Sequence, residues 1–299
     1  MRTLQLSSGD LVADRRASYA AALAEELDFA AAADLMVQVL ELTQDWIAGW
    51  HLLGQYREEA GDIEGAIAAW DRVQALDKLG VFGAALKLAA YGRGTPEPVT
   101  RYVEALFDDY APRFEDQLLG ALGYRTPEEL GALIRQAGGG GVVLDLGCGT
   151  GLMGQELRNC ASRLDGVDLS EAMLAEAARK GIYDRLEQGD LMLHLGAARD
   201  IDLIAAADVL NYVGALPPVL SAALVALRPG GLFAFSLETQ NGPEPLVVQP
   251  SLRFAHAPDA ALAEVVASGF TLVASRETVL RQDRGVDVPG LLVVAQRPV

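Results

Sequence analysis

The chain has 299 residues, 51% of them hydrophobic, and its formal net charge at pH 7 is −17, from 41 acidic and 24 basic residues. This length predicts about two domains, and so apolar a composition predicts buried cores rather than disorder. The acidic balance, with no run of Lys or Arg, argues against nucleic acid or an anionic membrane as a partner.

The low numbers of cysteine and histidine residues argue against a disulfide-rich protein and against a metal-binding protein. Cys148 and Cys160 alone cannot build a disulfide framework, and the three histidines show no metal-ligand spacing, so no metal is expected. The N-terminal stretch MRTLQLSSGDLVADRR lacks the apolar segment of a secretion signal, and later apolar stretches are interrupted by Asp or Pro. We therefore expect a cytoplasmic protein that does not span a membrane.

Residues 1–92 are rich in Ala and Leu at helical spacing, which predicts an all-α domain. One stretch matches the spacing of a tetratricopeptide repeat (TPR), a pair of helices with small residues where they touch: Trp50, Leu53, Gly54, Gly61, Ala66 and Trp70. Ala20, Ala32 and Met36 stand 34 residues before Gly54, Ala66 and Trp70. Small residues thus align with small ones and a large residue with a large one, as in a second copy of the repeat. A plain helical bundle is the alternative. Because about three repeats are usually needed for independent stability, this TPR-like domain should pack against the rest of the chain.

Residues 93–137 are interpreted as a linker followed by lid helices. GRGTPEPVT, residues 92–100, combines glycines and prolines and predicts the linker. Helical periodicity returns in RYVEALFDDYAPRFEDQLLGALGY, where Tyr110 and Phe114 share one face of the expected helix. In TPEELGALIRQAG, Thr126 is expected to be the N-cap of a further helix.

Residues 138–299 alternate between strand and helix patterns. Apolar runs predict four strands, and a further strand is expected before the EQGD motif; the four are 142–147, 163–169, 201–210 and 232–238. Amphipathic helices between them predict a doubly wound, Rossmann-like parallel sheet of the α/β class. Two β-rich runs near the end of the chain predict a C-terminal antiparallel hairpin, over 270–282 and 289–298.

The first of these strands leads into a glycine-rich turn, VLDLGCGTGLMGQEL, which would point backbone N–H groups and a helix N-terminus at a ligand. Two registers are open. Gly149, Gly151 and Gly154 spell G-x-G-x-x-G, the pattern of a dinucleotide-binding fold. Asp145 and Gly147 extend the pattern to D-x-G-x-G-x-G. An acid at that point would repel a pyrophosphate, and it suits a ligand with a cationic amino group and a sulfonium.

Several motifs together carry a resemblance to a known family: DLGCGTG, GVDLS, RPGG and the preceding YVEALFDDYAPRFEDQLLGALGYRTPEEL. From about residue 138 to the C-terminus, the chain resembles class I S-adenosylmethionine-dependent methyltransferases. The whole chain resembles bacterial predicted methyltransferases that contain TPRs. The family's sheet ends in an antiparallel strand, which agrees with the expected hairpin better than a dehydrogenase fold does.

The resemblance implies S-adenosylmethionine as cofactor and S-adenosylhomocysteine as product. It implies that the loop glycines let the backbone approach the cofactor, that Asp145 holds the amino end directly or through water, and that Asp168 holds the ribose. The implied cofactor-binding residues are Asp145, Gly147, Gly149, Gly151, Asp168, Leu169, Met173, Asp190, Leu191 and Asp208. A strand-end Asp can equally be a helix cap or a turn residue. Cys148 is interpreted as a small filler of the loop rather than a nucleophile.

Methyl transfer from a sulfonium requires alignment and exclusion of water, and a base only where the attacking atom arrives protonated. The candidate catalytic residues are His256, Tyr110 and Glu238, and the candidate substrate-binding residues are Phe114, Asn211, Tyr212 and Arg253. His256 could deprotonate an acceptor or anchor the following helix. Arg253 could pair with an acceptor carboxylate or with a surface acid. Tyr110 and Phe114 could close over the cofactor or pack the lid onto the sheet.

The leading interpretation is in-line methyl transfer to a small-molecule acceptor. AAADVLNYVGAL lacks the N/D-P-P-Y/F signature of DNA and glutamine methyltransferases, which argues against those acceptors. One alternative is a protein or peptide acceptor recruited by the TPR-like domain. A non-catalytic S-adenosylmethionine-binding scaffold and a dehydrogenase are the others.

Overall fold

Two units make up the chain, Met1–Tyr102 and Val103–Val299. A computed structural model describes residues 7–95, 99–115, 123–283 and 285–299 of them. Parts of the expected linker and of the expected helix in RYVEALFDDYAPRFEDQLLGALGY lie outside the described residues. The boundary between the units falls within helix α6 (Thr100–Tyr110).

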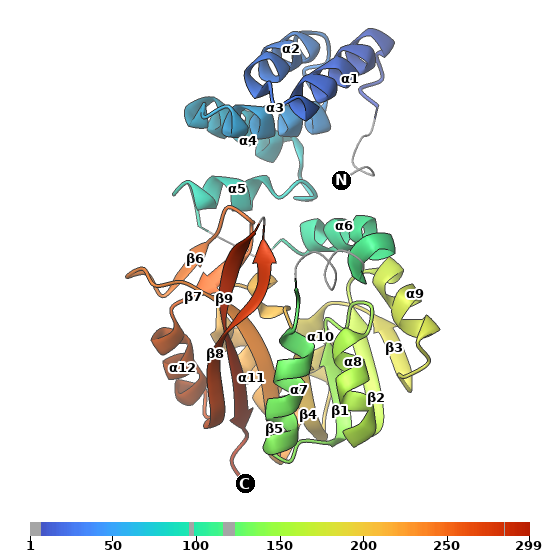
Figure 1. The fold of residues 1–299 in the computed structure, drawn as a ribbon, viewed down its shortest axis with the longest axis vertical. Coiled ribbons are helices and arrows are strands. Elements are labelled where there is room, and N and C mark those ends of the chain that lie inside the picture. The colour runs from blue at the N-terminus through green and yellow to red at the C-terminus, as the bar shows by residue number, and fades with distance from the viewer. Residues whose placement is uncertain (1–6, 96–98, 116–122, 284) are drawn as a thin grey trace. The chain divides into compact units, whose positions relative to one another are not determined.

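The described part of the first unit is helical, as Figure 1 shows. Its helices are α1 (Leu11–Glu25), α2 (Phe29–Leu42), α3 (Ile47–Glu59), α4 (Ile63–Leu76) and α5 (Ala84–Ala90). Asp28 begins α2 by accepting a hydrogen bond from the Ala31 N–H, and Asp62 begins α4 by accepting one from the Gly65 N–H. These two caps stand 34 residues apart, so helix initiation repeats at the interval that aligns the small and large residues.

The aligned positions form the core of this unit. Five of them are completely buried: Ala20, Ala32, Met36, Ala66 and Trp70. A Cβ at Gly54 would lie 2.3 Å from Nε1 of Trp70. Only a glycine at this position of α3 lets α4 approach so closely.

The second unit alternates strands and helices. Its strands are β1 (Gly141–Leu146), β2 (Ala161–Asp168), β3 (Arg185–Gln188), β4 (Ile201–Ala206), β5 (Leu227–Thr239), β6 (Leu246–Val248), β7 (Phe254–His256), β8 (Thr271–Asp283) and β9 (Val286–Gln296). Its helices after α6 are η1 (Ala111–Arg113), α7 (Thr126–Gln136), α8 (Leu152–Leu157), η3 (Arg158–Cys160), α9 (Glu171–Arg179), α10 (Leu191–Ala197), η4 (Leu210–Tyr212), α11 (Leu216–Ala226) and α12 (Pro258–Ala267).

The strands of this unit join in one sheet. Its central order is β3-β2-β1-β4-β5, and all four of these pairings are parallel. β9 pairs antiparallel with β5, and β8 pairs antiparallel with β9. The strand order reverses between β1 and β4: β2 and β3 follow on one side of β1, and β4 and β5 follow on the other. Ligands of doubly wound sheets bind at the carboxyl ends of the strands at such a point.

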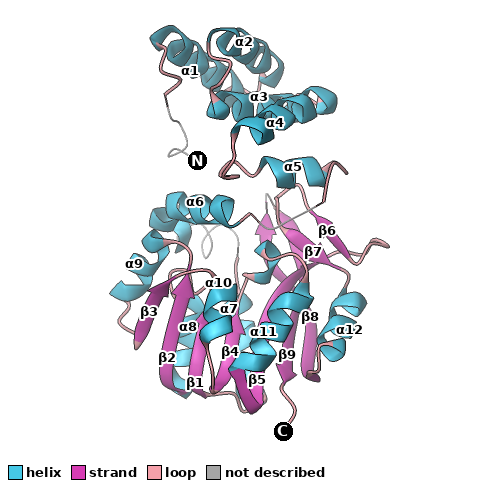
Figure 2. Cartoon of the chain, turned by 180° about the vertical axis from the view of Figure 1, so that it is seen from behind, coloured by secondary structure: helices cyan, strands magenta, loops and turns pink. Residues whose placement is uncertain are grey.

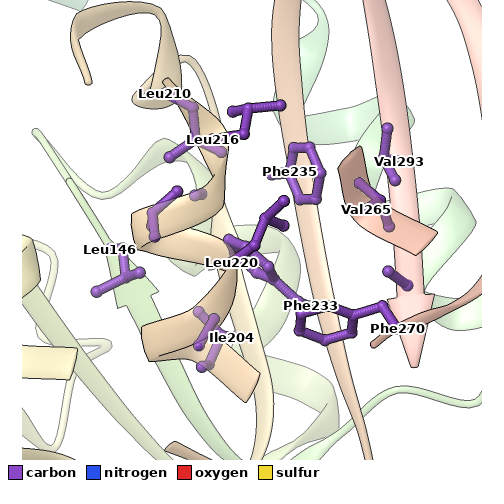
Figure 3. Close-up of a cluster of buried hydrophobic side chains, with 14 of the residues drawn as sticks. Leu146, Ile204, Leu210, Leu216, Leu220, Phe233, Phe235, Val265, Phe270 and Val293 are labelled. Carbon is purple, nitrogen blue, oxygen red and sulfur yellow. The ribbon is translucent and has the colours of Figure 1, made fainter. Parts of the chain in front are cut away.

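Helices cover both faces of the sheet. α7 and α8 lie on the face seen in Figure 1, and α10 and α11 lie on the face seen in Figure 2. Leu220 of α11 and Val265 of α12 belong to the same hydrophobic cluster as Phe233 and Phe235 of β5 (Figure 3). Because both faces are covered, the central strands are apolar along almost their whole length, which is why the sequence predicts them well.

β7 occupies a place that the sequence did not predict. β4 pairs with β5 only as far as Phe235, and β7 then pairs with Glu238 and Thr239 in parallel. Glu238 also pairs with Gly290 of β9, so β7 takes the edge of β5 that β4 leaves free. The stretch SLRFAHAP is thereby fixed at the carboxyl end of the central sheet.

The expected N-cap role of Thr126 is wrong. Thr126 is the first residue of α7, its preceding Arg125 is the N-cap, and neither side chain caps the helix. The Thr126 hydroxyl is buried and lies 3.5 Å from the Leu280 carbonyl of β8, so it faces the sheet instead of the helix N-terminus. In the described ranges, no helix combines the length and the apolar character needed to cross a bilayer.

Candidate active site

The loop between β1 and α8 has a backbone conformation that favours glycine. Gly147, Gly149 and Gly151 have φ angles of +59°, +53° and +91°, which fall in the left-handed region. A Cβ at Gly149 would meet no heavy atom of the described chain within 4 Å. The space on the Cβ side of Gly149 is therefore open, and a ligand can approach the backbone closely there.

Asp168, at the end of β2, is tied to this loop. Its Oδ2 accepts a hydrogen bond of 2.8 Å from the Gly149 N–H, and its Oδ1 accepts one of 2.9 Å from the Ser170 N–H. Burial raises the pKa of Asp168, and these backbone N–H groups oppose the rise. A carboxylate oxygen can accept more than one hydrogen bond. Asp168 thus acts as a turn residue and keeps acceptor capacity for a ligand.

Asp145 of β1 is 1% exposed and has one oxygen without a partner. Its Oδ2 accepts a hydrogen bond of 2.6 Å from the Tyr183 hydroxyl, and its Oδ1 has no hydrogen-bond partner among the described residues. Burial raises the pKa of Asp145 to about 7, and the bond from Tyr183 opposes the rise. An unpartnered buried acceptor is costly in a folded protein. Oδ1 is therefore the group of this loop that most needs a ligand.

Tyr183 also accounts for Gly154, the third glycine of the G-x-G-x-x-G spelling. A Cβ at Gly154 would lie 2.2 Å from the Tyr183 hydroxyl oxygen. Gly154 makes room for a side chain of the protein itself, so this spelling has a packing origin here. The D-x-G-x-G-x-G register, which begins at Asp145, describes the site better.

Four further residues implied as cofactor contacts follow β2 and β3. Asp190 caps α10, because its Oδ1 accepts hydrogen bonds of 2.8 and 3.2 Å from two backbone N–H groups. Leu169 and Leu191 are half-buried, whereas Met173 is 1% exposed. Leu169 and Leu191 therefore keep surface that an adenine could contact, and Met173 keeps almost none.

Residues 103–115, here named the lid segment, are held beside the end of β2. The Ser170 hydroxyl, at the N-cap of α9, donates a hydrogen bond of 2.6 Å to Oδ1 of Asp108. At the other end of α9, Lys180 Nζ lies 2.6 Å from Oε1 of Glu115. These two contacts place the lid segment next to the strand that carries Asp168.

Aromatic rings join the lid segment to η4, which follows β4. The Phe107 ring makes edge contacts with Tyr212 and Phe114, with centroids 5.3 and 6.2 Å apart. Tyr110 and Phe114 are 5.4 Å apart in the same type of contact. The predicted residues Tyr110, Phe114 and Tyr212 thus do come together, and Phe107 is the ring that connects them.

Four charged side chains meet at the ends of β4 and β5, and we call Asp208, Glu238, Arg253 and Arg281 the charged cluster. Arg281 Nη1 lies 3.0 and 3.2 Å from the two carboxylate oxygens of Asp208, and Nη2 donates to Oε1 of Glu238. Arg253 Nη1 lies 3.6 Å from the same Glu238 oxygen. Burial raises the pKa of Glu238, and the two arginines oppose the rise. Two acids and two arginines balance the charge of the cluster.

Asp208 has a strained backbone that its neighbours hold in place. Its φ is +61°, in the left-handed region that residues other than glycine rarely adopt. Its N–H donates a hydrogen bond of 2.8 Å to the Ser236 hydroxyl, and Asn211 Nδ2 donates to its carboxylate. Asn211 Oδ1 in turn accepts a hydrogen bond of 2.9 Å from the Glu238 N–H. Such strain is concentrated at functional sites, and Asp208 lies in the charged cluster; its predicted role in cofactor binding stays a prediction.

Arg253 is directed into the site and away from surface acids. Its Nε donates a hydrogen bond of 2.7 Å to the Tyr212 hydroxyl, and its guanidinium lies 5.6 Å from the centroid of that ring. Its side chain keeps 23% of its surface exposed. Within the described residues, its Nη2 has no hydrogen-bond partner, so Arg253 has capacity left for an acceptor.

His256 lies on β7 and is 3% exposed. Its Nε2 is 3.0 Å from the Gly214 carbonyl, and its Nδ1 has no partner in the described part of the chain. Burial lowers the pKa of His256, which favours the neutral ring. These contacts tie His256 to Gly214, just before α11, and its roles as an anchor of the following helix and as a base both stay predictions.

Sequence reasoning missed Tyr183 and Arg281. Tyr183 stands between α9 and β3 in a stretch without a motif, and its signal is the three glycines around it, Gly151, Gly154 and Gly166. In β8, a bulge lies between Val279 and Arg281, and both Leu280 and Arg281 are buried. The alternation of an ordinary strand would have placed one of those two side chains outside the core.

Residues 143–231, from β1 into β5, match the protein family described as a methyltransferase domain. Over 94 residues the chain is 33% identical to malonyl-[acyl-carrier protein] O-methyltransferase of Enterobacter lignolyticus, covering 31% of this chain and 38% of that protein. It is 40% identical over 94 residues to trans-aconitate 2-methyltransferase of Pseudomonas paraeruginosa, covering 31% and 34%. It is 33% identical over 145 residues to human methyltransferase-like protein 27, covering 45% and 57%. The chain thus spans between about a third and somewhat more than half of the length of these curated relatives.

Two solved structures share the fold of the second unit. The [4+2]-cyclase SpnF superposes with a TM-score of 0.57 at 18% identity, over 69% of this chain and 99% of that chain. A Burkholderia thailandensis 1,6-didemethyltoxoflavin-N1-methyltransferase, solved with S-adenosylhomocysteine, gives 0.53 at 20% identity, over 69% and 92%. These similarities establish the Rossmann-like methyltransferase fold. Because one of the two is named as a cyclase, the fold alone does not specify the reaction.

Residues 143–231 of the second unit thus resemble the methyltransferase domains of these relatives, and S-adenosylmethionine is the implied cofactor. The residues of the second unit fit that cofactor. The unpartnered Oδ1 of Asp145 suits an ammonium group, the open space at Gly149 admits a ligand against the loop, and Asp168 stands beside both. An acid at the position of Asp145 would repel the pyrophosphate of a dinucleotide.

Proposed function

We propose that the second unit transfers a methyl group from S-adenosylmethionine to a small-molecule acceptor. One observation carries the proposal: the carboxyl edge of a single sheet holds two arrangements. One is an open glycine loop beside a carboxylate oxygen, Oδ1 of Asp145, that has no partner among the described residues, and the other is a separate charged cluster beside the lid segment. The first arrangement suits the cofactor. The second suits a polar acceptor that must meet it.

The bound cofactor supplies a methyl group on a good leaving group, and the protein has to bind, align and exclude water. Asp145 holds the amino end, and Asp168 accepts hydrogen bonds from the ribose. The adenine lies against Leu169 and Leu191, with Asp190 beside it. The lid segment, through Tyr110 and Phe114, keeps water from the methyl group. These roles follow the positions of the residues at the ends of β1, β2 and β3.

The acceptor carries an anionic or carbonyl group that meets Arg253. Its guanidinium keeps exposed surface and an Nη2 without a partner among the described residues, while Tyr212 and Glu238 fix its direction. Two of the relatives are named for malonyl and aconitate substrates, both of which contain carboxyl groups. Glu238 and His256 are the groups that could accept a proton from a protonated acceptor.

The first test is incubation of the protein with methyl-labelled S-adenosylmethionine and a cell extract that is then separated by size. Label in the small-molecule fraction supports the proposal and yields a product to identify. An Asp168→Ala variant, which should bind the cofactor poorly, provides the blank. Label only in the macromolecular fraction contradicts the small-molecule acceptor, and cofactor binding without any transfer favours a scaffold.

A second candidate is a protein or peptide acceptor recruited by the first unit. We infer that this unit is TPR-like, because the caps Asp28 and Asp62 repeat at the interval of the buried small and large residues. Stacked helix pairs of this type commonly bind peptides. Transfer of label to a macromolecule by the full chain would favour this candidate.

A further inference from the structure

We propose that Tyr183 is a positioning residue that reserves one oxygen of Asp145 for the ammonium group of the cofactor's methionine end. The inference rests on the proposed function. The Tyr183 hydroxyl donates a hydrogen bond of 2.6 Å to Oδ2 of Asp145. With that oxygen occupied and the carboxylate fixed in rotation, Oδ1 is left as the acceptor.

The fold makes a slot for the Tyr183 ring out of three glycines. A Cβ at Gly151 would lie 3.1 Å from the ring, one at Gly154 would lie 2.2 Å from the hydroxyl oxygen, and one at Gly166 would lie 2.9 Å from the ring. These glycines come from the N-terminus of α8, from α8 itself and from β2. A glycine inside a strand, such as Gly166, usually marks the close approach of another group. The absence of a side chain at these three positions thus leaves the space that the Tyr183 ring occupies beside Asp145.

The remaining oxygen, Oδ1, is left to accept the cation. Oδ1 of Asp145 is buried and has no hydrogen-bond partner among the described residues. A carboxylate free to rotate could present either oxygen to a ligand, in several orientations. The bond from Tyr183 removes that freedom before the ligand arrives, and such preorganisation increases affinity. The effect should be confined to ligands that carry the amino-acid end.

Tyr183→Phe tests the proposal, because it removes only the hydroxyl and keeps the ring in its slot. Calorimetry should measure the Kd of S-adenosylhomocysteine and of 5′-methylthioadenosine, which shares the adenosine but lacks the amino acid. We expect the Kd of S-adenosylhomocysteine to rise about tenfold, as for loss of a hydrogen bond to a charged group. The Kd of 5′-methylthioadenosine should stay within about twofold of the wild type.

Asp145→Asn provides the second background. If Tyr183 acts through the Asp145 carboxylate, Tyr183→Phe should have almost no further effect on the Kd of S-adenosylhomocysteine in the Asp145→Asn protein, so the two changes should be strongly non-additive. Equal weakening of both ligands, or additive effects, would make Tyr183 a packing residue and overturn the proposal. An unchanged Kd for S-adenosylhomocysteine would also overturn it. A wild-type protein that binds neither ligand would instead refute the proposed function itself.

Discussion

The Asp145 carboxyl lies in surroundings that resist its ionisation. Burial is the largest effect, and the neighbouring Asp168 carboxylate adds to it. Tyr124 and the Cys148 thiol also lie within its electrostatic reach, and only the Tyr183 hydroxyl favours the charged form. The folded protein therefore keeps a proton up to about pH 7 that the unfolded chain releases near its usual pKa of 3.8. Between these values the folded state binds more protons, so the free energy of unfolding falls as pH rises.

Asp145→Asn removes this loss of stability, because the amide cannot ionise. We expect the variant to melt at a Tm at least about 3 °C above the wild type at pH 8, since 1 kcal/mol corresponds to about 2–4 °C for a unit of this size. At pH 3, below the usual pKa of 3.8, the carboxyl is protonated in both the folded and the unfolded chain, and the gain should disappear. Melting curves at both pH values check this. A variant less stable than the wild type at pH 8 would show that the ionised carboxylate does not destabilise the folded state.

Asp168→Ala should weaken binding of S-adenosylhomocysteine about tenfold or more, because it removes a charged acceptor and releases the Gly149 N–H that Asp168 holds. Calorimetry measures the change directly. Asp62→Ala is a suitable comparison, since Asp62 caps α4 of the first unit and its loss should affect stability more than affinity. Unchanged affinity in Asp168→Ala would exclude Asp168 as a ribose ligand.

At the scale of elements, the lid segment depends on one ring for its contact with η4. Phe107→Ala removes two edge contacts, with Tyr212 and Phe114, each worth about 0.5–1.5 kcal/mol beyond area burial. We expect S-adenosylhomocysteine to dissociate about fivefold faster or more, because the lid segment opens more often. Stopped-flow displacement gives the rate. Val103→Ala, a truncation of another buried residue of α6 without an aromatic contact, is the matched control.

Arg281 joins β8 to the ends of β4 and β5 through Asp208 and Glu238. Arg281→Met keeps the volume and removes the charge, which leaves the half-buried Asp208 and the buried Glu238 with Arg253 as the remaining cation of the charged cluster. Loss of one partner of a buried pair costs about 3–5 kcal/mol, so a clear fall in Tm is expected. Adding Glu238→Gln should recover part of the loss, because it removes one of the two negative charges. Absence of any recovery in the double variant would contradict this account.

Strands β1, β4 and β5 could be predicted from the sequence because each contains an apolar run that is buried in the sheet. The glycine loop and the acids that follow β1 and β2 could be predicted because their spacing is local. The partners of these acids could not. Tyr183 reaches Asp145 from a loop 38 residues later, and Arg281 enters the charged cluster only because β8 contains a bulge. The short strand β7 has three residues, of which two pair with β5, too few to produce a periodic signal.

At the scale of the whole molecule, the cofactor residues and the charged cluster all lie in Val103–Val299, which has its own two hydrophobic cores. The first unit has separate cores formed by α1–α5 and the turns between them. Among the described residues, each unit thus has buried apolar clusters of its own. Cofactor binding and acceptor recruitment can therefore be tested on different parts of the chain.

A chain that starts at Val103 should fold and bind S-adenosylhomocysteine with a Kd within about threefold of the full chain, a difference below about 1 kcal/mol. The labelled transfer experiment then distinguishes the two acceptor classes. If the acceptor is a small molecule bound at the charged cluster, the shorter chain should still label it. If the first unit recruits a protein or peptide, the shorter chain should bind the cofactor normally and lose most of the transfer, because the recruiting surface has been removed while the cofactor site remains. A shorter chain that is folded but has lost cofactor affinity would contradict both expectations and would make the first unit part of the cofactor site.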